Sequence, residues 1–300
     1  MPLTPAAILV SLSMLLATGP ASALQKVENY WVGSLSSPLF GTNSKDARRP
    51  DVVIYVPSKY RATPAVDLVF YFHGMRNCAL NVAANKGCAG GGNDPGQSII
   101  SQFERSGLNA ILVVLQGAYN RGANDLRLKS ASSGFFRKFL LEEPEFTSAL
   151  RQATGKGMAG LGKIWLAGHS GAYVPMQIVL KDGGLDSQIA GVILLDSLYS
   201  AADWTPAFTA WKSERPDARM VAICQDTAKN VKAVMAGLKA AGQTAWQGSA
   251  NAAPAALRPE PFQFYVTGVP HPAIPGKFFG PLLTAMQKPA AAPVTTPKRK

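Results

Sequence analysis

Apolar residues gather in short continuous runs that alternate with stretches of helical periodicity. Such runs are typical of strands buried on both faces of a sheet. We predict eight strands, at residues 30–35, 51–57, 67–72, 110–115, 163–167, 189–195, 219–223 and 262–267. Helices are predicted at residues 98–105, 135–152, 172–181, 201–212, 228–241 and 276–287. This alternation predicts the α/β class, with a mostly parallel sheet covered by helices on both faces.

The two ends of the chain differ from this pattern. An uncharged apolar stretch at residues 6–17 is followed by Gly19-Pro20 and then by Ala21-Ser22-Ala23. This order is typical of a signal peptide over residues 1–23, cleaved after Ala23. The alternative is an uncleaved membrane anchor, but the stretch is short for a hydrocarbon layer of about 30 Å. We therefore expect a periplasmic or secreted protein with no integral membrane span after cleavage.

The rest of the chain is long enough for one large domain, which we place at residues 24–288. Residues 289–300 are rich in Ala, Pro and Thr and end in Lys298-Arg299-Lys300, so we predict a disordered basic tail. The net charge is +12, but the basic residues are scattered without a stripe of interleaved aromatic residues. We therefore predict no nucleic-acid partner.

Export changes the interpretation of the three cysteines. Cys78 and Cys88 bracket a loop rich in Gly and Asn, and we predict that they form a disulfide in an oxidising compartment. Two cysteines without a nearby histidine do not complete the four ligands of a structural metal site, so no metal is predicted. Cys224 ends an apolar strand and is predicted to be a buried free thiol.

Ser170 lies in the segment Gly168-His169-Ser170-Gly171-Ala172-Tyr173, between a predicted buried strand and a predicted helix. This segment resembles the nucleophile elbow, G-x-S-x-G, of the α/β-hydrolase family, with Ala172 at the last small position. Eight strands with the serine after the fifth also resemble that family. The resemblance extends over most of residues 24–288, and it implies the α/β-hydrolase fold with Ser170 as the nucleophile.

A nucleophilic serine needs a base, and the chain has three histidines. His169 adjoins the serine in sequence and is expected to point away from it. His73 ends the third predicted strand. His271 follows the last predicted strand within Pro270-His271-Pro272, where the family places its base, so the resemblance implies that His271 is the base.

The segment His73-Gly74-Met75 follows the third predicted strand. It resembles the His-Gly motif that supplies one oxyanion donor in this family. We assign the two backbone N–H donors to Met75 and to Gly171, just after the serine. The alternative is a strand-end turn in which Gly74 only provides flexibility.

Two aspartates compete for the role of the acid. Asp196 follows the sixth predicted strand and is expected to be partly buried, so it needs a hydrogen-bond partner such as an imidazole. Asp226 follows the seventh, where most relatives have the acid, but it also suits the start of the helix near Ala228. We favour Asp196 and keep Asp226 as the alternative.

The expected function is an exported serine hydrolase, carboxylesterase-like, acting through a Ser-His-Asp triad and an acyl-enzyme. The alternatives are an envelope acyltransferase with the same triad and a non-catalytic binding protein on the same fold. The expected partner is a small-molecule or acylated substrate. No cofactor motif is visible in the sequence. Two segments, 75–94 and 116–134, and four aromatic residues are candidates to border the pocket: Tyr119, Tyr173, Tyr199 and Trp204.

Overall fold

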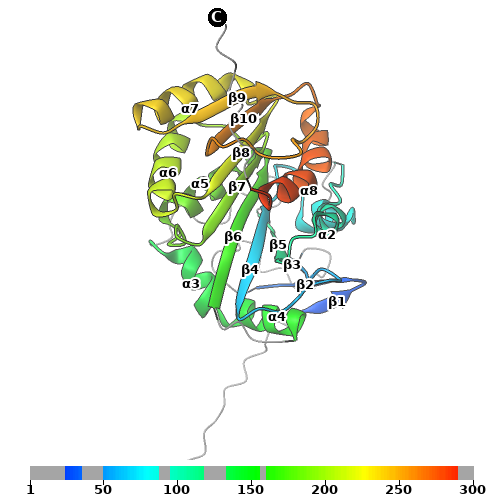
Figure 1. The fold of residues 1–300 in the computed structure, drawn as a ribbon. Coiled ribbons are helices and arrows are strands. Elements are labelled where there is room, and N and C mark those ends of the chain that lie inside the picture. Colours follow the sequence, from blue (N-terminus) through cyan, green and yellow to red (C-terminus); the bar gives the residue numbers. More distant parts are fainter. Residues whose placement is uncertain (1–23, 36–49, 88–94, 118–132, 156–159, 290–300) are drawn as a thin grey trace, which may run out of the picture.

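The computed structural model describes residues 24–35, 50–87, 95–117, 133–155 and 160–289. A ten-stranded sheet runs through the molecule in the order β1-β2-β3-β5-β4-β6-β7-β8-β10-β9 (Figure 1). The strands are β1 (Gln25–Val27), β2 (Tyr30–Gly33), β3 (Val52–Tyr55), β4 (Ala65–Phe72), β5 (Ile111–Leu115), β6 (Gly160–His169), β7 (Ile189–Leu195), β8 (Arg219–Cys224), β9 (Ala245–Ser249) and β10 (Phe262–Val266). The pairs joining β1, β2, β3 and β5 are antiparallel, and all other pairs are parallel.

The predicted fold class is confirmed, but the predicted number of eight strands is wrong. Each predicted strand is present, and the structure adds β1 and β9 at the two edges of the sheet. Both added strands are short, and their residues are exposed or half-buried. An edge strand buried on neither face has no continuous apolar run, which is why the pattern of apolar residues did not reveal them.

The helices lie in the predicted intervals, with two differences. They are α1 (Ala79–Ala84), α2 (Ile99–Ser106), α3 (Phe135–Glu142), α4 (Pro144–Thr154), α5 (Tyr173–Asp182), α6 (Ala201–Glu214), α7 (Ala228–Ala240) and α8 (Ile274–Met286). The helix predicted at 135–152 is divided because Glu143 is extended before Pro144, a conformation that proline imposes on the residue before it. The short helix α1 was not predicted.

Two layers of helices cover the sheet (Figure 1). Helices α3 to α7 contribute to the core on one face, and α1, α2 and α8 contribute to the core on the other. Successive side chains of strand β4 alternate between the two cores: Phe70 and Phe72 face one core, and Val69 and Tyr71 face the other. The sheet is thus buried on both sides, as its continuous apolar runs require.

Some predictions concern residues that the structure does not describe. These are the signal peptide at 1–23, the tail from residue 290, Tyr119, and Cys88 with most of its loop. Cys78 is buried, and its pairing with Cys88 stays a prediction. The prediction for Cys224 is confirmed, because it is a buried free thiol whose pKa is raised to about 12 by burial. Among the described residues, no helix is long and apolar enough to cross a membrane.

The parallel strands bring the candidate catalytic residues to one edge of the sheet. Ser170 follows β6 directly, and Asp196 follows the adjacent strand β7. His73 follows β4, on the other side of β6, and His271 follows β10 after a short loop. Because carboxyl ends of parallel strands share an edge, these turns meet there.

Candidate active site

Ser170 lies at a sharp turn between strand and helix. Strand β6 ends at His169, residues Ser170–Ala172 form a 3₁₀ turn, and α5 begins at Tyr173. The φ angle of Ser170 is +54°, a conformation that few residues other than glycine adopt. Strain of this kind concentrates at functional sites, and it is a feature of the nucleophile elbow.

Small residues allow the chain to fold tightly behind the serine. A Cβ atom on Gly168 would lie 2.6 Å from Cβ of Ala172 and 2.5 Å from Sδ of Met176. The methyl group of Ala172, where the family pattern has glycine, is therefore accommodated because Gly168 has no side chain. On the other side of the turn, a Cβ on Gly74 would lie 3.0 Å from Cβ of Ser170. The close approach of the His73-Gly74 turn to the elbow thus depends on glycine.

Asp196 and His271 form a short hydrogen bond across the site. Nδ1 of His271 lies 2.6 Å from Oδ2 of Asp196, which is fully buried. The carboxylate also accepts hydrogen bonds from the backbone N–H groups of residues 225, 226 and 227 and from the Thr227 hydroxyl. These donors fix the carboxylate, and it in turn fixes the orientation of the imidazole. Because Nδ1 faces Asp196, Nε2 is the nitrogen of His271 left to exchange a proton with a nucleophile.

The environment of Asp196 keeps it ionised. Burial alone would raise the pKa of this carboxyl, but hydrogen bonds from His271 and Thr227 and from the backbone outweigh burial and hold the pKa well below its usual range. A fixed negative charge at this position stabilises the imidazolium that forms when His271 takes a proton. The buried carboxylate therefore has the properties of the acid in a triad.

Asp226, the alternative acid, lies farther from the imidazole. Its Oδ2 is 3.8 Å from Nδ1 of His271, and its side chain is 52% exposed. Asp196, Asp226 and His271 are also the one group of the described residues with ligand atoms close enough to hold a metal ion. The oxygens of Asp196 are already occupied by N–H and O–H donors, which favours a hydrogen-bonded triad over a metal centre.

A buried chain of hydrogen bonds holds His271 beside the elbow. Nε2 of His169 lies 3.1 Å from the carbonyl oxygen of His271, so this nitrogen carries the proton and donates. Nδ1 of His169 then accepts from Nε2 of Gln97 at 3.3 Å, and Oε1 of Gln97 accepts from the Tyr71 hydroxyl at 2.6 Å. The rings of His169 and His271 lie 4.4 Å apart. Both ring nitrogens of His169 are thus engaged, and one of them fixes the loop that carries His271.

His169 itself stays neutral. Burial and the neighbouring His271 lower its pKa to about 3. A neutral ring is needed here, because Nδ1 must accept a hydrogen bond while Nε2 donates one. His169 therefore acts as a structural bridge and is not a second candidate base.

His73 is buried and orients the peptide that follows it. Its Nε2 lies 2.8 Å from the backbone N–H of Gly117 and accepts from it, so Nδ1 carries the proton and donates to the carbonyl of Gly74 at 2.7 Å. In a trans peptide the carbonyl and the next N–H point in opposite directions. The N–H of Met75 is thereby directed away from His73, and among the described residues no hydrogen bond occupies it. Burial lowers the pKa of His73 to about 4.

Two further residues contact the serine, and sequence reasoning gave them no such role. The Ser197 hydroxyl donates to the backbone carbonyl of Ser170 at 2.7 Å and so ties the elbow to the end of β7. The Tyr199 side chain lies beside the side chain of Ser170, and its pKa is raised by burial and by the two nearby aspartates. Tyr199 was named only as an aromatic residue of the pocket. The one signal in the sequence for a role of Ser197 and Tyr199 at the site is that both follow Asp196 closely.

The strand order and the position of the elbow identify the fold. Ser170 follows the fifth of the eight predicted strands, and the strands on either side of it are parallel. The chain has the α/β-hydrolase fold. Its sequence matches no protein-family model, and no curated protein matches it.

Two solved structures are similar to this chain. One is a siderophore hydrolase, EstB, from Aspergillus nidulans, with 11% identity, a TM-score of 0.41, and coverage of 91% of this chain and 93% of the other. The second is a soluble variant of the monoglyceride lipase from Saccharomyces cerevisiae, with 10% identity, a TM-score of 0.35, and coverage of 85% and 88%. Both TM-scores are low, so the fold is identified from the strand order and not from these structures.

The aromatic candidates for the pocket separate into two groups. Tyr173 and Tyr199 lie beside the elbow with their ring centres 5.5 Å apart. Trp204, by contrast, is completely buried and stacks on Phe208 in the core, so it does not border an open pocket. The segments 75–94 and 116–134 are described only in part.

Proposed function

We propose that this chain is an exported serine hydrolase that cleaves carboxylic esters through Ser170, His271 and Asp196. The observation that supports it most strongly is the 2.6 Å hydrogen bond between His271 and the buried Asp196. That pair lies at the same edge of the sheet as a serine in a strained strand-to-helix turn. Serine, imidazole and carboxylate in this order are the parts that acyl transfer requires.

In the first half of the reaction, Oγ of Ser170 attacks the carbonyl carbon of the ester. Nε2 of His271 takes the hydroxyl proton, and the ionised Asp196 stabilises the resulting imidazolium. The oxygen of the tetrahedral intermediate becomes negative and needs donors that are already in place. We assign these donors to the backbone N–H groups of Gly171 and Met75, where losing one donor typically costs about 10²–10³ in rate.

The intermediate collapses when His271 returns its proton to the leaving alcohol. The bond between the carbonyl carbon and the alcohol oxygen breaks, and an acyl group remains on Ser170. Water then attacks the acyl-enzyme while His271 again acts as base. The carboxylic acid leaves, and the serine hydroxyl recovers its proton.

Substitution of the nucleophile tests this proposal. We expect Ser170→Ala to lower kcat for p-nitrophenyl acetate by a factor of at least about 10³, because the nucleophile is lost. Ser187→Ala is the matched control, since Ser187 is exposed and, among the described residues, its hydroxyl is hydrogen-bonded only to Gln188. The two variants should have the same melting temperature as the wild type. Undiminished turnover by Ser170→Ala would contradict the proposal. Formation of a transesterified product when an alcohol is added would indicate that the protein is an acyltransferase.

A further inference from the structure

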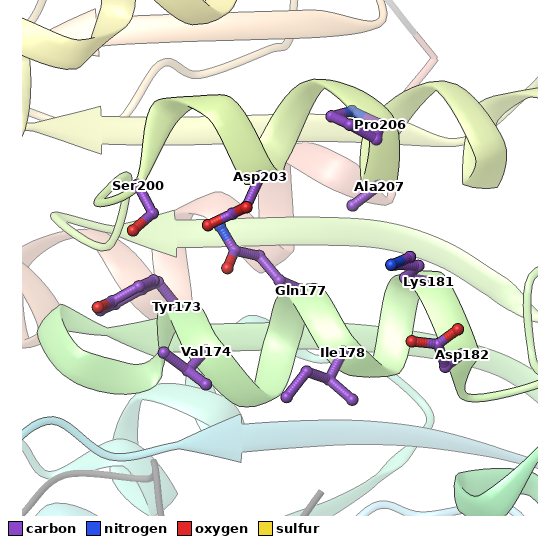
Figure 2. Close-up of a pocket in the computed structure, with 10 residues that line it drawn as sticks. All are labelled: Tyr173, Val174, Gln177, Ile178, Lys181, Asp182, Ser200, Asp203, Pro206 and Ala207. Atoms are coloured by element: carbon purple, nitrogen blue, oxygen red, sulfur yellow. The ribbon is translucent and has the colours of Figure 1, made fainter. Parts of the chain in front are cut away.

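A cavity of about 550 Å³ lies between α5 and α6. Figure 2 shows that both helices turn side chains toward it. Both apolar and polar side chains line it, and the end near the elbow is marked by Tyr173 and Ser200. The far end is marked by Lys181 and Asp182. A cavity of this size suits a small molecule or part of one.

One end of the cavity lies close to the elbow, because Tyr173 lines it and is the first residue of α5. The ring of Tyr173 packs against Tyr199, which lies beside Ser170. Helix α5 starts directly after the elbow, so Gln177 lies roughly 10 Å beyond Ser170 at a rise of 1.5 Å per residue. A substrate bound at Ser170 therefore has this cavity within reach.

Gln177 is the unusual side chain of the cavity. It is 91% buried, and its Nε2 makes no hydrogen bond. Its amide group reaches from α5 toward Asp203 of α6 (Figure 2). A buried donor without a partner is destabilising, so an acceptor that enters the cavity and bonds Nε2 removes that cost.

We propose that the acyl part of the ester lies in this cavity and carries a second, neutral carbonyl oxygen that accepts a hydrogen bond from Nε2 of Gln177. This inference rests on the function proposed above and adds the class of substrate. The carbonyl belongs to an ester or amide roughly 10 Å from the scissile bond, as set by the helix rise. The apolar residues Val174, Ile178 and Pro206 line the space that the intervening chain occupies.

The charges around Gln177 favour a neutral acceptor. A carboxylate at this position would face Asp203 and Asp182, and like charges in a partly buried site repel. A cation would face the donor Nε2. Lys181 at the far end of the cavity offsets the negative charge of one of the two aspartates, so the charge of the other remains. A neutral oxygen is therefore the acceptor that suits the N–H donor of Gln177.

The acyl side of the ester, and not the alcohol side, suits the cavity. The leaving alcohol must lie near His271, which gives it a proton. His271 leads into α8, and α8 covers the opposite face of the sheet from α5 and α6 (Figure 1). The acyl group therefore extends away from His271, toward the α5–α6 face.

Two p-nitrophenyl esters of equal chain length test the inference: the ester of ε-acetamidocaproic acid and the nonanoate. The first has an amide carbonyl near the expected position, and the second has only methylenes. We expect Gln177→Met to lower kcat/KM for the acetamido ester about three- to tenfold relative to the nonanoate, as loss of one hydrogen bond implies. The ratio of the two values does not depend on the fraction of folded enzyme. Gln177→Glu, which keeps the shape but has no N–H, should lower the same ratio.

The matched control is Gln247→Met, at an exposed glutamine on β9, which should leave both esters unaffected. An equal change for both esters in the Gln177 variants would overturn the inference, and it would indicate that Gln177 pairs with Asp203. Failure of the proposed function has a different signature, because the wild type would then not hydrolyse p-nitrophenyl acetate at all.

Discussion

Asp196 and Asp226 show how two residues of one type acquire different properties in the same site. Both follow apolar strands, but only Asp196 turns its carboxylate into the protein, where it accepts hydrogen bonds from Thr227 and from His271. Its φ angle is +48°, a conformation that aspartate tolerates better than most residues. The side chain of Asp226 is about half exposed. We therefore assign the orienting role to Asp196.

Replacement of each aspartate by asparagine tests that assignment. We expect Asp196→Asn to lower kcat for p-nitrophenyl acetate by about 10²–10⁴, because an amide neither holds the imidazole in the required tautomer nor stabilises its cation. Asp226→Asn should cause a much smaller loss. A larger loss in the Asp226 variant would show that the acid is wrongly assigned, and steady-state kinetics at neutral pH would decide.

At the scale of residues, the sequence predicted the candidate catalytic residues but not the contacts that support them. Ser170, Asp196 and His271 were placed by their positions after strands. The sequence did not predict the roles of Gln97, Ser197 and Tyr199, because each role depends on a contact with a residue far away in the chain. Their residue types alone carry no such signal.

Elements were predicted best where burial is complete. Strands β4, β5 and β7 are almost wholly buried, and each was visible as an uninterrupted apolar run. The edge strand β9 lacks such a run. The helix α1 is buried but has only six residues, too few to show a helical period. The break between α3 and α4 was missed although Pro144 marks it, because the apolar periodicity continues across the proline and dominated the prediction.

The arrangement of elements also explains why the site can be strained. Ser170 has a positive φ between β6 and α5, and both elements are anchored in the core by residues such as Leu166 and Met176. A turn held at both ends by packed elements can retain a conformation that costs about 1–3 kcal/mol. The hydroxyl is thus presented at the sheet edge by the rigidity of its neighbours.

At the scale of the molecule, two buried histidines link stability to pH. His73 and His169 have pKa values lowered to about 4 and about 3, compared with an ordinary value near 6.5. Below about pH 6.5 the unfolded chain binds protons that the folded chain does not, so stability falls as the pH decreases. The ionised Asp196, whose pKa is lowered, adds a further loss only below its ordinary value near 3.8.

We therefore expect the free energy of unfolding to be smaller at about pH 5 than at about pH 7.5, by on the order of 1–2 kcal/mol for each histidine. Urea titrations at the two pH values measure this difference. The variant His73→Asn keeps a side-chain N–H for the carbonyl of Gly74 and should show about half of the dependence. A stability that rises on acidification to pH 5 would contradict the burial of these two rings as neutral groups.

Export and the Cys78–Cys88 disulfide stay predictions at this scale. Leu24, the first residue after the predicted cleavage site, is buried, and its carbonyl accepts a hydrogen bond from Gln152. The Leu24 side chain also packs against Gly33, where a Cβ would lie 2.4 Å from Cδ2 of Leu24. Leu24 is thus packed into the described fold, while the predicted domain boundary and cleavage site stay predictions.

The proposed mechanism depends on Ser170 being an activated nucleophile. Covalent labelling measures the reactivity of this serine most directly. A fluorophosphonate reacts when the serine oxygen attacks phosphorus and fluoride leaves, so only an activated hydroxyl is modified at an appreciable rate. Peptide mass spectrometry of the labelled full-length protein should place the adduct on Ser170, with slower labelling in Asp196→Asn. An enzyme that hydrolyses p-nitrophenyl acetate but carries no adduct on Ser170, or carries it on another residue, would contradict the account.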